Sequence, residues 1–278
     1  MPLLDWPALL GRPLPTGAQR IAYGPAPEQV ADLWLPAGEG PHPVVLMAHG
    51  GCWLSGVAKL TIMNYAAEDL RERGYAVWNI EYRGVDRPGG GYPGTFEDVA
   101  AGADALARIA PQHRLDLSRL VAFGHSAGGH LVLWLAARAA IPASSPLHSA
   151  APLRVARVVS AGGLPDLEED HRQGICGATT VEKLTGAATP ARPDVYADTS
   201  PAALAAHPDE AVLINGVEDG IAPPALGADY VAKLRAKMRA SGARIRQIVE
   251  PDTGHVELIA PGTAVWTKTV EAIDALAR

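Results

Sequence analysis

The stretch from Leu120 to Gly129 most constrains what this chain can fold into. A short apolar run ends there in a Gly-His-Ser-Ala-Gly turn, and a strongly apolar segment, Leu131 to Ala140, follows at once. Gly124 and Gly128 stand where strand and helix would approach too closely for a Cβ atom. The pattern therefore predicts a strand, a tight turn and a buried helix, with Ser126 held in a strained conformation at the top of a sheet.

Similar apolar runs recur along the chain, and segments with helical periodicity separate them. The expected strands cover residues 19–23, 30–35, 44–48, 75–80, 120–123, 155–159, 211–214 and 245–249. The expected helices cover residues 60–73, 96–109, 131–140, 226–238 and 265–276. Buried strands that alternate with helices indicate parallel strands joined by right-handed crossovers. The predicted fold class is therefore α/β, with a mostly parallel eight-stranded sheet and helices on both faces.

Two segments depart from this alternation. Residues 166–199 hold several charges and many turn residues but no strand-like run, so they predict a small helical cap insertion over the site. Residues 1–18 are rich in Pro, Gly and Leu and are expected to pack as a lead-in against the body. With no repeat and no low-complexity tract, residues 1–278 are expected to form a single domain.

Composition excludes several classes of protein. An apolar share of 48% and a charged share of 19% indicate a well-packed globular chain. The net charge of −6, without a Lys/Arg run, predicts no nucleic-acid or anionic-membrane partner. No secretory leader or membrane-length apolar run is recognised, so a cytoplasmic location is expected. In that reducing compartment, Cys52 and Cys176 are expected to be free thiols.

A serine hydroxyl needs a base within hydrogen-bond reach, and that base needs an acid to orient it. His255 is the predicted base, because Gly254-His255 follows the last expected strand and should lie at the same sheet edge as Ser126. The acid should follow the strand at 211–214. Asp219 is preferred there, and its neighbour Glu218 stays open as an alternative.

The segment His49-Gly50-Gly51-Cys52-Trp53 follows the first buried strand. Acyl transfer builds negative charge on a carbonyl oxygen, and fixed N–H donors stabilise that oxyanion. Glycines let the backbone turn its N–H groups inward. Gly51 and Cys52 are therefore expected to donate, together with Ala127 at the start of the helix after Ser126. His49 is expected to brace this loop.

These pieces together resemble the α/β-hydrolase superfamily over residues 19–278. The His-Gly-Gly-x-Trp and Gly-His-Ser-Ala-Gly-Gly-His motifs are similar to the branch of kynurenine formamidases and hormone-sensitive-lipase-like carboxylesterases. The resemblance implies an α/β-hydrolase fold and a triad of Ser126, Asp219 and His255. It also implies an oxyanion hole from Gly51, Cys52 and Ala127. Cys52 departs from the lipase-like His-Gly-Gly-Gly form, which favours the formamidase-like version without settling the substrate.

The expected activity is hydrolysis of short-chain or aryl carboxylic esters through an acyl-enzyme, with no cofactor and no metal. An arylformamidase acting on a substrate such as N-formylkynurenine is the enzymatic alternative. A catalytically inactive ligand-binding protein of the same fold is the non-enzymatic one. Trp53, Tyr82 and Tyr92 are candidate substrate-binding residues. The expected partner is a small-molecule ester or amide, and a homodimer stays open.

Overall fold

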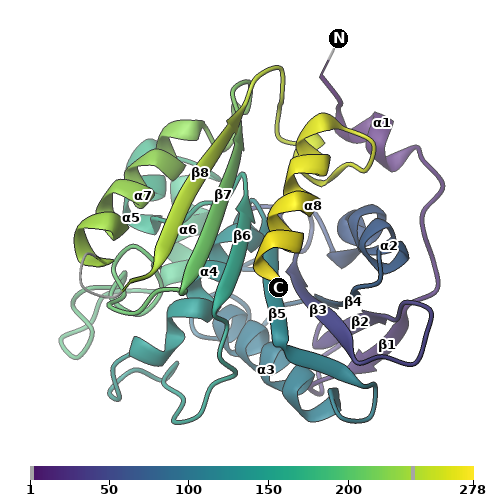
Figure 1. The fold of residues 1–278 in the computed structure, drawn as a ribbon. Coiled ribbons are helices and arrows are strands. Elements are labelled where there is room, and N and C mark those ends of the chain that lie inside the picture. The colour runs from purple at the N-terminus through teal and green to yellow at the C-terminus, as the bar shows by residue number, and fades with distance from the viewer. Residues whose placement is uncertain (1–2, 239–241) are drawn as a thin grey trace.

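An eight-stranded sheet forms the centre of the computed structural model, which describes residues 3–238 and 242–278 (Figure 1). Its strands, in spatial order β1-β2-β4-β3-β5-β6-β7-β8, pair in parallel from β4 to β8, whereas β1 and β2 are antiparallel. The bounds are β1 Gln19–Ala22, β2 Val30–Trp34, β3 His42–Ala48, β4 Ala76–Ile80, β5 Leu115–His125, β6 Arg157–Ala161, β7 Glu210–Gly216 and β8 Arg244–Glu250. The predicted mostly parallel sheet is confirmed.

Helices cover both faces of the sheet (Figure 1). The α-helices are α1 Trp6–Leu10, α2 Asn64–Glu72, α3 Gly94–Ile109, α4 Ala127–Ala137, α5 Leu167–Gln173, α6 Ala178–Thr185, α7 Pro224–Met238 and α8 Ala264–Leu276. Short 3-10 helices are η1 Leu60–Met63, η2 Arg138–Ala140 and η3 Glu257–Ile259. Successive β3 residues point to opposite faces, so Leu46 packs with the cluster of α3, α4 and α7, and Met47 with that of α1, α2 and α8.

The register brings the carboxyl ends of the central strands together. Ala48 of β3 lies opposite Gly124 of β5, and His125 lies opposite Ala161 of β6. Ala161 is in turn opposite Ile214 of β7. The loops that follow these strands therefore meet at one edge of the sheet, which is the edge where α/β proteins bind their ligands.

The segment between β6 and β7 holds α5 and α6, which lie beside one another. Asp166 accepts a hydrogen bond from the Glu169 N–H at 3.4 Å and caps α5, and Gly174 ends that helix in the left-handed region at φ 71°. Val181 and Leu184 of α6 are fully buried in the cluster that contains α3 and α4. Whether this segment acts as a cap remains a prediction. No helix within the described ranges has the length and apolar character needed to span a membrane.

Cys52 and Cys176 form a disulfide with their Cα atoms 5.4 Å apart, so the expectation of free thiols is wrong. Cys52 lies in the loop after β3, and Cys176 lies in the turn between α5 and α6. A separation of 124 residues in the sequence hides this proximity, because only the folded chain brings that turn to the β3 loop. The bond therefore ties the predicted oxyanion loop to the segment inserted between β6 and β7.

Candidate active site

Ser126 occupies the turn between β5 and α4 with φ 54° and ψ −124°, a left-handed conformation that is strained for a serine. Close backbone approach explains the glycines around it. A Cβ on Gly124 would lie 2.1 Å from the Gly128 carbonyl oxygen, and one on Gly128 would lie 2.1 Å from that of Ala48. The turn thus places Ser126, which is only 2% exposed, at the carboxyl edge of the sheet, and close packing of the surrounding chain maintains the strained conformation.

Asp219 and His255 are in direct contact. The Asp219 Oδ2 atom lies 2.7 Å from His255 Nδ1, and Asp219 is buried. The other carboxylate oxygen accepts hydrogen bonds from the Ile221 N–H at 2.9 Å and the Ala222 N–H at 2.8 Å, which fix its orientation. Glu218, the alternative acid, points into solvent. Of the two carboxylates, Asp219 is the one in contact with the imidazole.

Ser126 and His255 line the same cavity, of about 250 Å³, at the carboxyl edge of the sheet. No hydrogen bond joins the Ser126 hydroxyl to the His255 ring among the described residues. Catalytic hydrogen bonds are often long without substrate and tighten when it binds. The cavity lining is Trp6, Leu10, Gly51, Cys52, Val57, Ala58, Ile62, His125, Ser126, Ile221 and His255.

The loop after β3 turns through three consecutive residues with positive φ, at 107° for Gly51, 52° for Cys52 and 54° for Trp53. Successive amides in such a conformation form a concave N–H surface that suits an anion. In the described part of the chain, the N–H groups of Gly51, Cys52 and Ala127 donate to no protein acceptor. Ala127 is also the first residue of α4, where the helix dipole favours negative charge. These donors remain available to an oxyanion.

His49 and Glu81 brace this loop from beneath. The His49 Nε2 atom lies 2.7 Å from Glu81 Oε1, and Nδ1 lies 2.7 Å from the Gly50 carbonyl oxygen. Burial raises the pKa of Glu81, but the His49 charge and hydrogen bonds from His49, Leu60 N–H and Tyr82 N–H outweigh it and hold that pKa below its usual value. Glu81 therefore stays a carboxylate behind the loop, and the contacts agree with the bracing role expected of His49.

His130, on the first turns of α4, is a buried structural histidine. Its Nε2–H donates to the Thr199 carbonyl oxygen at 2.9 Å, and its Nδ1 accepts from the Trp53 indole N–H at 3.2 Å. Burial lowers the pKa of His130 to about 4. The neutral ring thus has both nitrogens satisfied by the protein.

The three aromatic residues predicted to bind substrate do not line this cavity. Trp53 is fully buried and donates to His130, while the Tyr82 hydroxyl donates to the His49 carbonyl oxygen at 2.9 Å. The Tyr92 hydroxyl donates to Asp198 at 2.9 Å. The Trp53 and Tyr82 rings are fully buried in the scaffold, which corrects the substrate-binding prediction for these two residues. The half-buried Tyr92 ring lies 3.7 Å from the Arg192 guanidinium carbon, and substrate binding by Tyr92 stays a prediction. An aromatic residue close to a motif in sequence signals packing as readily as binding.

Sequence reasoning missed the apolar walls of the cavity. Trp6 and Leu10 come from α1, and Val57 and Ile62 come from the segment after the β3 loop. Ile221 comes from the loop that carries the predicted acid, Asp219. Ile221, two residues beyond Asp219, was the one wall residue whose place in the sequence could have identified it. The contribution of α1 carries no local signal, since it depends on where the lead-in crosses the surface.

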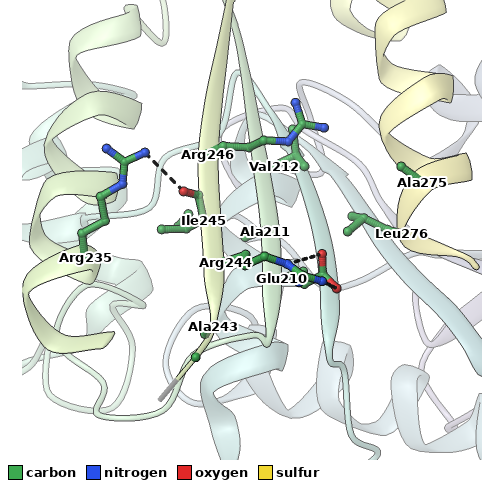
Figure 2. A pocket seen from close by; sticks show the side chains of 11 residues that line it. Glu210, Ala211, Val212, Arg235, Ala243, Arg244, Ile245, Arg246, Ala275 and Leu276 are labelled. Carbon is green, nitrogen blue, oxygen red and sulfur yellow. Dashed lines mark hydrogen bonds and ion pairs between the residues drawn. The ribbon is translucent and has the colours of Figure 1, made fainter. Parts of the chain in front are cut away.

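A larger hollow of about 540 Å³ lies at the opposite edge of the sheet, where β7 and β8 begin (Figure 2). Arg244 pairs there with Glu210 at 2.7 Å, and Arg235 of α7 donates to the Ile245 carbonyl oxygen at 3.4 Å. None of the predicted triad or oxyanion residues lines it. Its position at the amino ends of these strands places it away from the cavity beside Ser126.

A family model described as BD-FAE matches residues 31–234. Because that match covers most of the chain, this protein belongs to the BD-FAE family. The membership and the fold confirm the α/β-hydrolase superfamily inferred from the motifs.

Individual relatives are more distant. The chain is 31% identical over 112 residues to a probable isoprenylcysteine alpha-carbonyl methylesterase ICMEL1 of Arabidopsis thaliana, a match that covers 40% of this chain and 23% of that protein. Among solved structures, esterase B of Lactobacillus rhamnosis has a TM-score of 0.74 at 21% identity, covering 94% of this chain and 86% of that one. The propionate-bound esterase Est2 of Thermogutta terrifontis has a TM-score of 0.70 at 18% identity, covering 93% of each chain. A bifunctional GH43-CE protein of Bacteroides eggerthii has a TM-score of 0.73 at 22% identity, covering 94% of this chain and 35% of that one.

Proposed function

We propose that this chain is a serine hydrolase that cleaves short-chain or aryl carboxylic esters through an acyl-enzyme. The observation that carries the proposal is the 2.7 Å contact between Asp219 and His255 at the cavity that Ser126 also lines. A strained serine, an oriented imidazole and unused backbone N–H groups at one sheet edge meet the requirements of acyl transfer. Similarity to proteins named as esterases supports the same reading.

In this mechanism the Ser126 hydroxyl attacks the ester carbonyl carbon while His255 Nε2 takes the hydroxyl proton. Asp219 holds the proton on Nδ1 and stabilises the resulting imidazolium. The N–H groups of Gly51, Cys52 and Ala127 stabilise the oxyanion. When the intermediate collapses, the ester C–O bond breaks and His255 gives its proton to the leaving alkoxide. Water then attacks the acyl-enzyme with the same base and releases the acid.

Two measurements test this function. A fluorophosphonate probe should label Ser126, and Ser126→Ala should abolish labelling and lower kcat by roughly a million-fold on p-nitrophenyl butyrate. Ser118→Ala is the matched control, because Ser118 is exposed near the opposite end of β5. Unlabelled, inactive wild-type protein would instead indicate a ligand-binding protein of this fold.

The substrate class is tested by comparing kcat/KM on p-nitrophenyl acetate, butyrate and octanoate with kcat/KM on N-formylkynurenine. The proposal expects the short esters to be the better substrates. A preference for N-formylkynurenine would indicate that the same residues hydrolyse an arylformamide, with an amine as the leaving group.

A cytoplasmic location and a homodimer remain predictions from the sequence. The Cys52–Cys176 disulfide weighs against the first, because protein disulfides persist mainly in oxidising compartments. Cell fractionation tests the location, and analytical ultracentrifugation of the purified chain tests the assembly.

A further inference from the structure

The outer wall of the cavity beside Ser126 comes from the N-terminal helix α1. Trp6 and Leu10, one turn apart on α1, both line the cavity. The Trp6 indole stands edge-on to the His125 ring, with centroids 6.1 Å apart. Leu9, between them in sequence, is fully buried in the core cluster that contains α2 and α8. The helix is thus anchored through Leu9 and presents its neighbours to the site.

Polar contacts on both sides of α1 fix its position. Before it, the Leu4 N–H donates to the carboxylate of Glu257. After it, the Arg12 guanidinium donates to the Pro261 carbonyl oxygen at 3.0 Å, and the Tyr65 hydroxyl donates to the Arg12 carbonyl oxygen at 3.2 Å. The wall is therefore a built part of the site.

Glu257 also connects this wall to the predicted base. Its Oε2 atom accepts a hydrogen bond from the Gly254 N–H at 3.1 Å, directly before His255. Glu257 itself is buried. One carboxylate thus holds the N-terminal segment with one oxygen and the His255 loop with the other. Glu257 thus links the segment before α1 directly to the loop that carries His255.

The chemistry of the cavity indicates what it receives. Among its lining residues there is no Asp, Glu, Lys or Arg, and the walls contributed by Leu10, Val57 and Ile221 are aliphatic. Its volume of about 250 Å³ lies below the range of roughly 300–1,000 Å³ typical of drug-sized ligands. An apolar cavity of about 150 Å³ holds one benzene molecule. The space therefore suits one short aliphatic chain or one aromatic ring without charge.

We propose that α1 is the specificity-determining wall of this site, with Trp6 and Leu10 limiting the length of the uncharged apolar group that the cavity accepts. The inference rests on the proposed ester hydrolysis and assigns its size limit to particular residues. Burying an apolar chain against these walls stabilises the bound ester, whereas a longer chain collides with the Trp6 ring. One extra or missing methylene in an apolar pocket changes kcat/KM by about 10- to 200-fold.

The test varies the wall and the substrate together. Trp6→Ala and Leu10→Ala should each raise the octanoate-to-butyrate ratio of kcat/KM on p-nitrophenyl esters by about tenfold or more. Trp6→Phe, which keeps a ring, should fall between Trp6→Ala and the wild type. Leu14→Ala is the matched control, because Leu14 is an exposed leucine of the same segment outside the cavity. The same kcat/KM ratios are then measured on methyl, butyl and octyl acetates, which test whether the wall limits the alcohol group of the ester instead of the acyl group.

An increase in the long-to-short ratio of kcat/KM in either series, without a matching change in the Leu14→Ala control, supports the role of α1 in limiting chain length. Ratios within about twofold of the wild type for both Trp6→Ala and Leu10→Ala, in both series and in variants with an unchanged Tm, would overturn it. Selectivity is the readout because loss of folded protein lowers every rate alike and leaves the ratio unchanged.

The proposal about α1 and the proposed ester hydrolysis can be tested separately. In a Ser126→Ala background, calorimetry measures the Kd of the intact p-nitrophenyl esters without turnover. Adding Trp6→Ala should tighten octanoate relative to butyrate there as well. If Ser126→Ala keeps full activity, the proposed function fails, while the octanoate-to-butyrate ratio of kcat/KM in Trp6→Ala and Leu10→Ala still tests the wall. If the Kd values do not respond to Trp6, the wall fails while the mechanism stands.

Discussion

The His125 ring donates its Nε2–H to the main-chain carbonyl oxygen of His255 across 3.0 Å, and the two rings lie 4.4 Å apart. A carbonyl oxygen only accepts, so the proton must be on Nε2. Burial, followed by the nearby charge of His255, holds the pKa of His125 well below its usual value. The His125 ring, directly before Ser126 in the chain, therefore stays neutral. It positions the backbone of the predicted base without opposing the charge that His255 would gain in the proposed mechanism.

Replacing this donor should affect turnover more than folding. His125→Phe keeps a ring of similar size but loses the bond to His255, and we expect kcat/KM to fall by about 10- to 100-fold through misplacement of the base. His125→Gln can still donate from its amide and should retain more activity than His125→Phe. The acid limb of the pH profile should not move, because neutral His125 does not titrate there. Equal losses in the two variants would contradict the positioning role.

The two neighbouring carboxylates can be separated by a matched pair of variants. Asp219→Asn removes the charge that faces His255 and should lower kcat by about 10⁴-fold, because the amide favours the wrong imidazole tautomer. Glu218→Gln changes an exposed side chain and should leave kcat within about twofold of the wild type. Steady-state kinetics on p-nitrophenyl acetate measure both. Comparable losses would mean that Glu218 supports the base when substrate is bound.

Local patterns account for the part of the fold and site that the sequence predicts. Ser126, Asp219 and His255 each follow a strand of the parallel part of the sheet, and the carboxyl ends of parallel strands meet at one edge. A strand pattern and a turn signal therefore suffice to bring distant residues together. The choice of Asp219 over Glu218 needed the structure, because adjacent loop residues differ only in the direction that the backbone gives them.

The remaining features depend on contacts between segments that share no pattern. Nothing near Cys52 or Cys176 predicts that the α5–α6 turn meets the β3 loop. Trp6 lines the site only because the lead-in is held by Glu257 and by the packing of Leu9. Single-sequence periodicity reports which face of an element is buried, but not which remote segment covers an opening.

The Cys52–Cys176 disulfide predicts a stability that depends on redox conditions. It closes a loop of more than a hundred residues, for which chain entropy implies a stabilisation of about 2–5 kcal/mol. Replacing both cysteines by alanine should lower the free energy of unfolding by about that amount. Because Cys52 belongs to the predicted oxyanion loop, kcat should fall as well.

Urea unfolding with and without dithiothreitol checks this prediction. The reductant should shift the wild-type midpoint towards that of the doubly substituted protein and should leave the latter unchanged. Equal midpoints for the two proteins under oxidising conditions would show that the bond contributes no net stability.

Asp170 of α5 predicts an unusual pH dependence. It is fully buried, and neither carboxyl oxygen has a hydrogen-bond partner in the described ranges. Burial, followed by repulsion from Asp166 and Glu169, raises the pKa of Asp170 to about 8. In the unfolded chain an aspartate titrates near pH ~3.9. Between these values the folded protein holds a proton that the unfolded chain releases.

The free energy of unfolding should therefore fall as pH rises from about 4 to about 8, by at most about 1.4 kcal/mol per pH unit from this group. Asp170→Asn stays neutral throughout, so it should remove this contribution and stabilise the protein at pH 8 relative to the wild type. Glu168→Gln, an exposed change on the same helix, should keep the wild-type slope. Urea midpoints at pH 5 and pH 8 measure the difference, and an unchanged slope in Asp170→Asn would mean that Asp170 is ionised in the folded state.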